Sequence, residues 1–134
     1  MEISPYLFFN GNCEEALEFY RSALGGDLQI SRYEGSPMAA DLPDDWKTKV
    51  MHATLTSGDA TFMASDSGPG NERPQGKNIA MSIGTADEAA ADRIFAKLSE
   101  GGNVTMPLQK TFWGAKFGML VDKFGIEWMV NCQL

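Results

Sequence analysis

Apolar and polar residues follow two periods along this chain, one typical of helices and one typical of strands. Residues 3–9 form a strand-like run that is rich in aromatic side chains. The apolar residues that follow recur at the spacing of one helix face: Ala16, Phe19, Tyr20, Ala23 and Leu24. Asn12 with Glu15 three residues later predicts a capping box at the start of this helix, and Gly25-Gly26 predicts its end.

Three further strands are predicted in the first half of the chain. Residues 28–33 predict one strand, and a polar, proline-containing stretch follows at residues 34–49. Residues 50–56 and 60–65 predict a hairpin with its turn at Ser57-Gly58-Asp59. The first half therefore has the order strand–helix–strand–strand–strand.

The second half of the chain repeats this order. A strand is predicted at residues 78–83, and Thr85 with Glu88 predicts a second capping box. The apolar face of the second helix comprises Ala91, Ile94, Phe95 and Leu98. Gly101-Gly102 predicts the end of this helix. The remaining predicted strands span residues 104–109, 116–121 and 126–131, and a turn at residues 122–125 joins the last two.

The repeat predicts an α+β fold built from two βαβββ modules. We assign residues 1–66 to the first module, 67–77 to a linker rich in glycine and proline, and 78–134 to the second. A module of this size cannot cover both faces of its own sheet, so the two should pair into one structural domain. The expected architecture is a curved mixed sheet with helices on its convex side and a concave face free for a ligand.

Composition excludes several classes of partner. The chain has 134 residues and a net charge of −7, and an acidic balance argues against binding to nucleic acid. No apolar run approaches the ~20 residues that span a bilayer, so no membrane partner is expected. The N-terminus lacks the basic start of a signal peptide, and two cysteines, Cys13 and Cys132, are too few for a disulfide scaffold. We therefore expect a cytoplasmic protein with reduced thiols.

Three motifs carry a resemblance to a known family. The first is YLFFNGNCEEALEFY at residues 6–20, and the last is DKFGIEWMVN at residues 122–131. The middle motif lies within residues 52–66 and consists of His52–Leu55, Gly58-Asp59 and Met63–Asp66. Together they resemble the PhnB-like branch of the vicinal-oxygen-chelate superfamily, which includes glyoxalase I, bleomycin-resistance proteins and extradiol dioxygenases. That branch often carries a 3-demethylubiquinone methyltransferase label, but no glycine-rich cofactor loop is present here. The resemblance also implies a homodimer whose chains share a pocket.

The same resemblance implies where a metal would be bound. Metal-using members place His, Gln or Glu ligands on the first and last strands of each module. The corresponding positions here are Pro5, Met63, Asn78 and Met129. A hard or borderline divalent ion prefers carboxylate or imidazole ligands, so neither the usual metal nor another cofactor is expected. A shift of one residue in the alignment would turn Glu127 inward instead.

His52 is the single histidine and has two interpretations. Strand alternation puts it with Thr54 on the face opposite Ala53, where it is either a general base in the cavity or a strand histidine bonded to polar neighbours. A pair of His52 as base and Glu127 as orienting carboxylate is a further possibility. Cys13 lies at a helix start, where the dipole can lower a thiol pKa, but no second histidine would activate it.

Methionine and aromatic residues predict the character of the pocket. The chain has eight methionines, and several fall in predicted strands. The residues that we expect to line a ligand pocket are Met63, Asn78, Met129, Trp113 and Thr54. Thioethers and aromatic rings favour an apolar or aromatic ligand. Residues 34–49 and 111–114 are candidates for a lid or a dimer contact.

These observations lead to two functional hypotheses. The first is a protein that binds or sequesters a small apolar or aromatic molecule, without the usual metal. The alternative is a glyoxalase-like lyase or isomerase that uses a non-standard metal site or His52 as base. A pure interaction module would be favoured if side chains filled the cavity completely.

Overall fold

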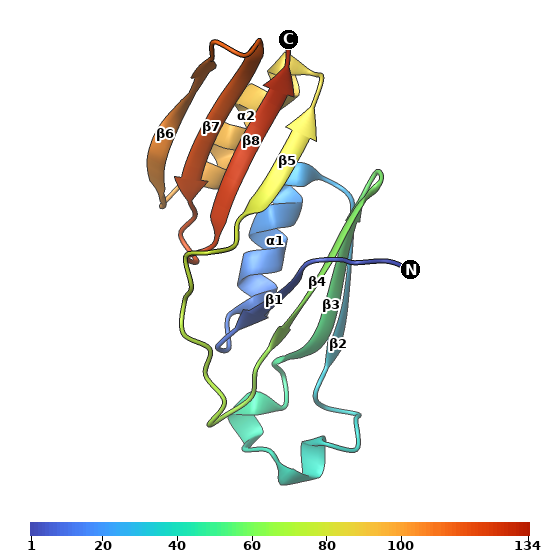
Figure 1. The fold of residues 1–134 in the computed structure, drawn as a ribbon. Helices are drawn as coiled ribbons and strands as arrows, with labels where there is room; N and C mark the ends of the chain where they lie inside the picture. The colour runs from blue at the N-terminus through green and yellow to red at the C-terminus, as the bar shows by residue number, and fades with distance from the viewer. The chain divides into compact units, whose positions relative to one another are not determined.

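In residues 1–74, one helix packs on one face of a four-stranded mixed sheet (Figure 1). The computed structural model describes all residues from 1 to 134. The elements of this first unit are β1 (Tyr6–Phe9), α1 (Cys13–Leu24), β2 (Asp27–Arg32), β3 (Val50–Ser57) and β4 (Ala60–Asp66). The strand order is β1-β4-β3-β2, in which β1 and β4 are parallel and the other pairs are antiparallel.

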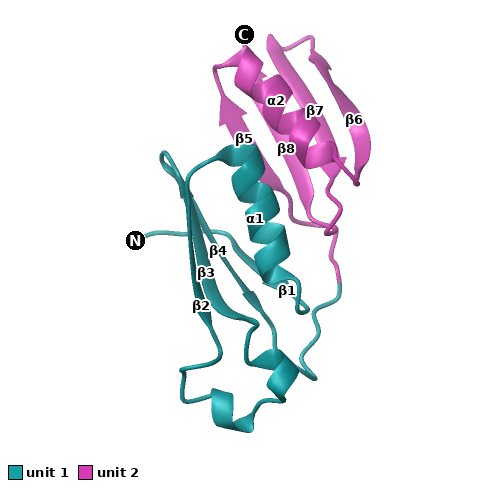
Figure 2. Ribbon diagram, turned by 180° about the vertical axis from the view of Figure 1, so that it is seen from behind, with its two compact units in different colours: residues 1–74 teal, residues 75–134 magenta.

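Residues 75–134 form a second unit with the same plan (Figure 2). Its elements are β5 (Met81–Thr85), α2 (Glu88–Ser99), β6 (Asn103–Lys110), β7 (Ala115–Val121) and β8 (Glu127–Gln133). The strand order β5-β8-β7-β6 again has one parallel pair, β5 with β8. The predicted α+β class with two βαβββ modules is confirmed, and each module builds its own mixed sheet. Neither helix is long and apolar enough to cross a membrane.

The limits of the elements differ from the predicted ones at a few places. β1 begins at Tyr6 and β5 at Met81, three residues later than predicted in each case. Ile3 and Ile79 are 94% and 81% exposed, so the apolar residues that extended the predicted strands have no core to enter. The polar stretch after β2 contains two short 3₁₀ helices, η1 (Ala39–Asp41) and η2 (Asp44–Trp46). Along the chain, the boundary between the two units falls between Pro74 and Gln75, inside the stretch predicted as a linker.

The start of α1 is held by a residue from a distant strand. The predicted capping box is wrong, because the Asn12 side chain makes no capping hydrogen bond. Asp66, at the end of β4, accepts instead: its Oδ1 accepts from the backbone N–H groups of Gly11 at 2.8 Å and Cys13 at 3.0 Å. Its Oδ2 accepts from the Val50 N–H at 2.9 Å. A carboxylate that is 1% exposed thus joins the β1–α1 turn to the start of β3.

The second predicted capping box is also wrong. Asp87 caps α2, and its Oδ1 accepts from the Ala90 N–H at 3.1 Å. The Thr85 hydroxyl accepts from the N–H of Asp87 itself, at 3.1 Å, and not from an N–H group inside the helix. An aspartate directly before the helix reaches the free N–H groups of the first turn, whereas Thr85 still belongs to β5.

Strand alternation separates the two faces of each sheet. In the first unit, the inward residues of β3 and β4 are buried against α1: Ala53, Leu55, Phe62 and Ala64. Tyr20 of α1 packs its ring 6.2 Å from that of Phe62. In the second unit, Leu120, Trp128, Val130 and Cys132 face Ala91, Phe95 and Leu98 of α2. The Trp128 Nε1–H donates to Asp122 at 2.8 Å, so the buried indole is satisfied.

Replacement of Asp66 by asparagine should lower the free energy of unfolding by about 3 kcal/mol, because the amide cannot accept from all three N–H groups. Urea unfolding at pH 7 measures the change. The matched control is Asp59→Asn in the exposed β3–β4 turn, for which we expect less than about 0.5 kcal/mol. Equal losses for the two variants would contradict the anchoring role of Asp66.

Gly118 of β7 should not tolerate a methyl group. A Cβ there would lie 2.8 Å from Leu108 Cα and 2.8 Å from Phe95 Cε2, which leaves no room between β6 and α2. We expect Gly118→Ala to destabilise the fold by about 2 kcal/mol in urea unfolding. Gly84 of β5 is the control, since no atom lies within 4 Å of a Cβ at that position. A Gly84→Ala variant as unstable as Gly118→Ala would refute the steric argument.

Candidate functional site

The face of the first sheet that turns away from α1 is lined by polar and half-exposed aromatic side chains. Residues that oppose one another directly share a face, and one row crosses all four strands: Tyr6, Met63, Thr54 and Gln29. His52 and Phe8 lie one pleat further along on the same face. We call this set the Tyr6 face. It combines an imidazole, a phenol, a hydroxyl and an amide with two apolar side chains.

His52 is engaged through both of its ring nitrogens. The Tyr6 hydroxyl lies 3.2 Å from Nδ1, and the Thr54 hydroxyl lies 3.2 Å from Nε2. In the neutral ring with its proton on Nε2, the Tyr6 O–H donates to Nδ1 and the Nε2–H donates to Thr54. The ring centroids of Tyr6 and His52 are 5.7 Å apart. Tyr6 was not among the predicted site residues, because its place opposite Met63 depends on the register between β1 and β4.

An aromatic edge borders this network. Phe8 is 42% exposed and its ring lies 5.0 Å from that of Tyr6, which is 38% exposed. The Arg73 guanidinium carbon stands 4.1 Å from the Phe8 ring centroid, a cation–π distance. Two hydrogen bonds between Asn10 and the Arg73 backbone hold that arginine in place. The positive charge of Arg73 therefore lies beside the exposed ring of Phe8.

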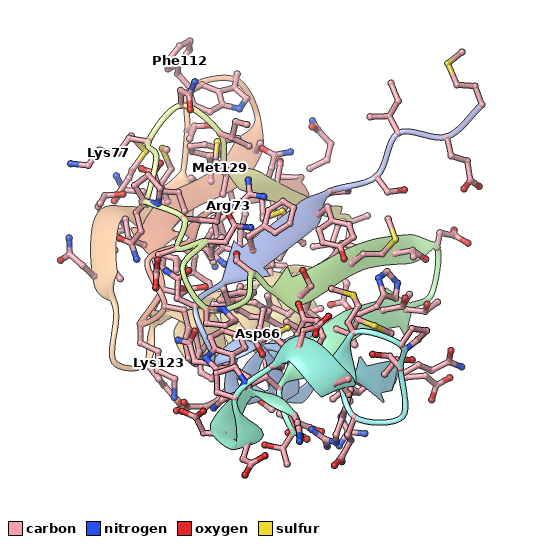
Figure 3. All side chains as sticks on the ribbon, turned by 90° about the horizontal axis from the view of Figure 1, so that it is seen from below. Asp66, Arg73, Lys77, Phe112, Lys123 and Met129 are labelled. Atoms are coloured by element: carbon pink, nitrogen blue, oxygen red, sulfur yellow. The ribbon has the colours of Figure 1, made fainter.

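The second sheet presents a different outward face. One row consists of Met106, Met119, Met129 and Ser82, each opposed to the next across neighbouring strands. Glu127 shares this face and opposes Val121. Trp113 precedes β7, is 51% exposed and lies 5.9 Å from the ring of Phe117. Its neighbour Phe112 is 96% exposed and projects away from the ribbon (Figure 3).

The predicted site residues are thus distributed over both units. His52, Thr54 and Met63 share the Tyr6 face, whereas Met129 and Glu127 share the outward face of the second sheet. Asn78 precedes β5 by three residues, and the residue opposite Met129 is Ser82. The proposed pairing of His52 with Glu127 joins residues of different units and stays a prediction.

The expected metal positions, Pro5, Met63, Asn78 and Met129, are divided between the two units. They offer a backbone carbonyl, two thioethers and a side-chain amide, and the residues directly opposite Met63 and Met129 are Tyr6 and Ser82. Hard and borderline divalent ions select carboxylate and imidazole ligands over these groups. The chain also contains no cluster of three or more His, Cys, Asp or Glu side chains suited to a metal.

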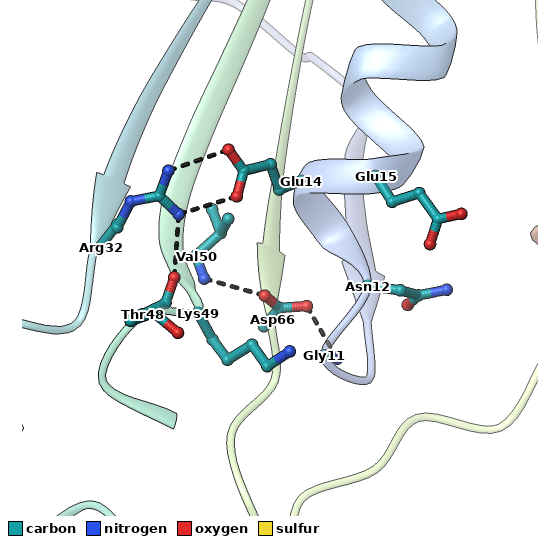
Figure 4. A pocket seen from close by; sticks show the side chains of 9 residues that line it. All are labelled: Gly11, Asn12, Glu14, Glu15, Arg32, Thr48, Lys49, Val50 and Asp66. Atoms are coloured by element: carbon teal, nitrogen blue, oxygen red, sulfur yellow. Dashed lines mark hydrogen bonds and ion pairs between the residues drawn. The ribbon is translucent and has the colours of Figure 1, made fainter. Parts of the chain in front are cut away.

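A polar pocket of about 560 Å³ lies at the start of α1, away from the predicted site (Figure 4). Glu14 and Arg32 form a two-pronged ion pair across it, with both N–O distances at 2.9 Å. The Arg32 hydrogen bonds lower the pKa of the Glu14 carboxyl, and Glu14 in turn raises the pKa of Arg32. Asp66 at its floor already accepts from three N–H groups. Glu14, Arg32 and Asp66 therefore all have partners within the protein.

The cysteines do not supply a nucleophile. Cys13 is fully buried, and its burial raises the pKa of the thiol far above its usual range, with Asp66 and Glu14 adding to the effect. Burial and the two nearby carboxylates destabilise the thiolate more than the helix dipole stabilises it. Cys132 is also fully buried.

The comparisons with known proteins cover almost the whole chain. The sequence profile of the family described as 3-demethylubiquinone-9 3-methyltransferase matches residues 1–131. The Escherichia coli (strain K12) protein YjdN is 33% identical over 144 residues, which cover 98% of this chain and 95% of YjdN. The solved structure of PA1353 from Pseudomonas aeruginosa is 46% identical, with a TM-score of 0.88 and coverage of 99% of this chain and 98% of that chain.

Two further solved structures are similar to this chain. The PhnB protein from Bacillus cereus is 30% identical, with a TM-score of 0.79 over 98% of this chain and 99% of that chain. A member of the glyoxalase/bleomycin resistance protein/dioxygenase superfamily from Sphaerobacter thermophilus shares the fold, with a TM-score of 0.60 at 19% identity over 99% of this chain and 98% of that chain. The chain therefore belongs to the 3-demethylubiquinone-9 3-methyltransferase family, to which the PhnB protein is similar, and it shares its fold with a member of the glyoxalase/bleomycin resistance protein/dioxygenase superfamily.

Proposed function

We propose that this chain binds a small apolar or aromatic molecule on the Tyr6 face, without the divalent metal of the superfamily. The observation that carries the proposal is the hydrogen-bonded chain Tyr6–His52–Thr54 beside the half-exposed Phe8 ring. A planar ligand would stack on the exposed rings, and one hydroxyl or carbonyl on it would bond to the Thr54 hydroxyl. Ligand sites combine a mostly apolar lining with few oriented polar groups in this way.

Methyl transfer is the activity that the family description names, and we do not assign it to this chain. The sequence holds no glycine-rich loop of the G-x-G-x-x-G type, which would bind a nucleotide-like cofactor at a strand-to-helix turn. Binding needs only the surface that the Tyr6 face offers.

The occupied ring nitrogens of His52 favour binding over proton transfer. A lyase or isomerase of glyoxalase type would need His52 as a general base, and the ring would then have to break its bond to Tyr6 or to Thr54. A binding protein keeps both bonds and uses them to orient Thr54. The homodimer and the cytoplasmic location expected from the sequence belong to the same proposal.

A matched pair of probes tests the role of Thr54. We expect 2-naphthol to bind more tightly than naphthalene, because only the former carries a hydroxyl. Thr54→Val keeps the shape of the residue and should weaken 2-naphthol binding about five- to tenfold, which corresponds to one hydrogen bond, without changing naphthalene binding. Amide chemical shifts in a two-dimensional NMR titration measure both affinities and locate the probe.

Two further variants complete this experiment. Met63→Glu inserts a charge into the face and should abolish binding of both probes, whereas Met38→Glu, at a site that is 54% exposed, should leave it unchanged. Shift changes confined to other strands would contradict the proposed site. Turnover of a hemithioacetal that is lost in His52→Gln would favour the lyase or isomerase instead.

A further inference from the structure

Three methionines stand side by side on the outward face of the second sheet. Met106 of β6 opposes Met119 of β7, and Met119 opposes Met129 of β8. Directly opposed residues point to the same side of a sheet, so three thioethers from three consecutive strands share one row. We call this set the methionine row. The sequence places its members far apart, and only the pairing of the strands brings them together.

The spacing of the strands lets the three sulfur atoms converge. Neighbouring strands lie about 4.8 Å apart, so β6 and β8 are about 10 Å apart with Met119 between them. Methionine has three rotatable bonds between backbone and methyl group, and the outer two side chains can turn toward the central one. Their sulfur atoms can therefore reach a common point above Met119.

The surroundings of Met106 give a soft ion access to this point. The β6–β7 register shifts on both sides of Met106, between Val104 and Met106 and between Met106 and Gln109. Such irregularities re-aim a side chain and occur on edge strands next to functional sites. Met106 is 42% exposed on the edge strand, while Met119 and Met129 are half-buried.

The donor chemistry selects one class of ion. Thioether sulfur is a soft, uncharged ligand that favours Cu(I) and does not compete for Zn²⁺, Mg²⁺ or Ca²⁺. Ser82 of β5 lies next to Met129 in the same row. The residues that flank the row on β7 and β8 are Phe117, Val121, Asn131 and Glu127, and Glu127 is the one carboxylate among them. That carboxylate cannot build a hard-ion site alone, and its negative charge complements a monovalent cation.

We propose that Met106, Met119 and Met129 bind one Cu(I) ion, or its probe ion Ag(I), through three thioether sulfur atoms. All three residues belong to the second unit, and binding involves no change in the oxidation state of the ion.

Metal titration of the reduced full-length chain tests this site. Under anaerobic conditions, Cu(I) is offered in competition with a chromophoric Cu(I) chelator, and we expect one ion per chain. X-ray absorption of the complex should show sulfur as the ligand atom. In a chain labelled with ¹³C at the methionine methyl groups, Ag(I) should shift three of the eight methionine signals.

Leucine variants keep the side-chain volume and remove the sulfur. Met119→Leu should weaken Cu(I) binding at least tenfold, and the triple variant with Met106→Leu and Met129→Leu should abolish it. Met38→Leu is the matched control and should bind as the parent does. Circular dichroism of each variant checks the fold. Cu(I) binding that survives in the triple variant, or a chain that never competes with the chelator, would overturn the proposal.

Discussion

The buried carboxylate of Asp66 is the contact on which the first unit depends. It is 1% exposed and accepts from three backbone N–H groups, those of Gly11, Cys13 and Val50. A carboxylate without such partners would cost several kcal/mol to bury, and the three N–H groups would likewise lose their acceptor. The end of β4, the start of α1 and the start of β3 are therefore held at one point. In the second unit, Asp122 holds together the turn between β7 and β8. It accepts from the Phe124 N–H, the Ile126 N–H and the Trp128 indole.

The helix that packs on each sheet determines which side chains of that sheet point away from it. Once a helix covers one face, strand alternation turns every second residue to the other. In the first unit this face carries Tyr6, His52 and Thr54 in one hydrogen-bonded chain. In the second unit it carries three methionines in register. Two modules with the same topology thus present different chemistry, one polar and aromatic, the other soft and apolar.

Membership of the family fixes the fold and leaves the chemistry to individual side chains. Met63 and Met129 supply thioethers at two of the four expected metal positions, and thioether sulfur is a poor ligand for a hard divalent ion. Met63 adds apolar, polarizable surface to the Tyr6 face, which is the proposed ligand site. Met129 is the third member of the methionine row.

The sequence alone determined the repeat, the helices and most strands, because periodicity and helix-ending glycines are local signals. It also led to the correct family through three motifs. It failed where contacts join distant residues: Asp66 caps α1 from 53 residues away, so Asn12 was the wrong cap. Local patterns do not encode the register between strands. That register decides where β1 and β5 begin, at Tyr6 and Met81, which residue contacts His52, and which methionines share a row. Only the tertiary structure decided these features, because pairing between strands selects which side chains meet.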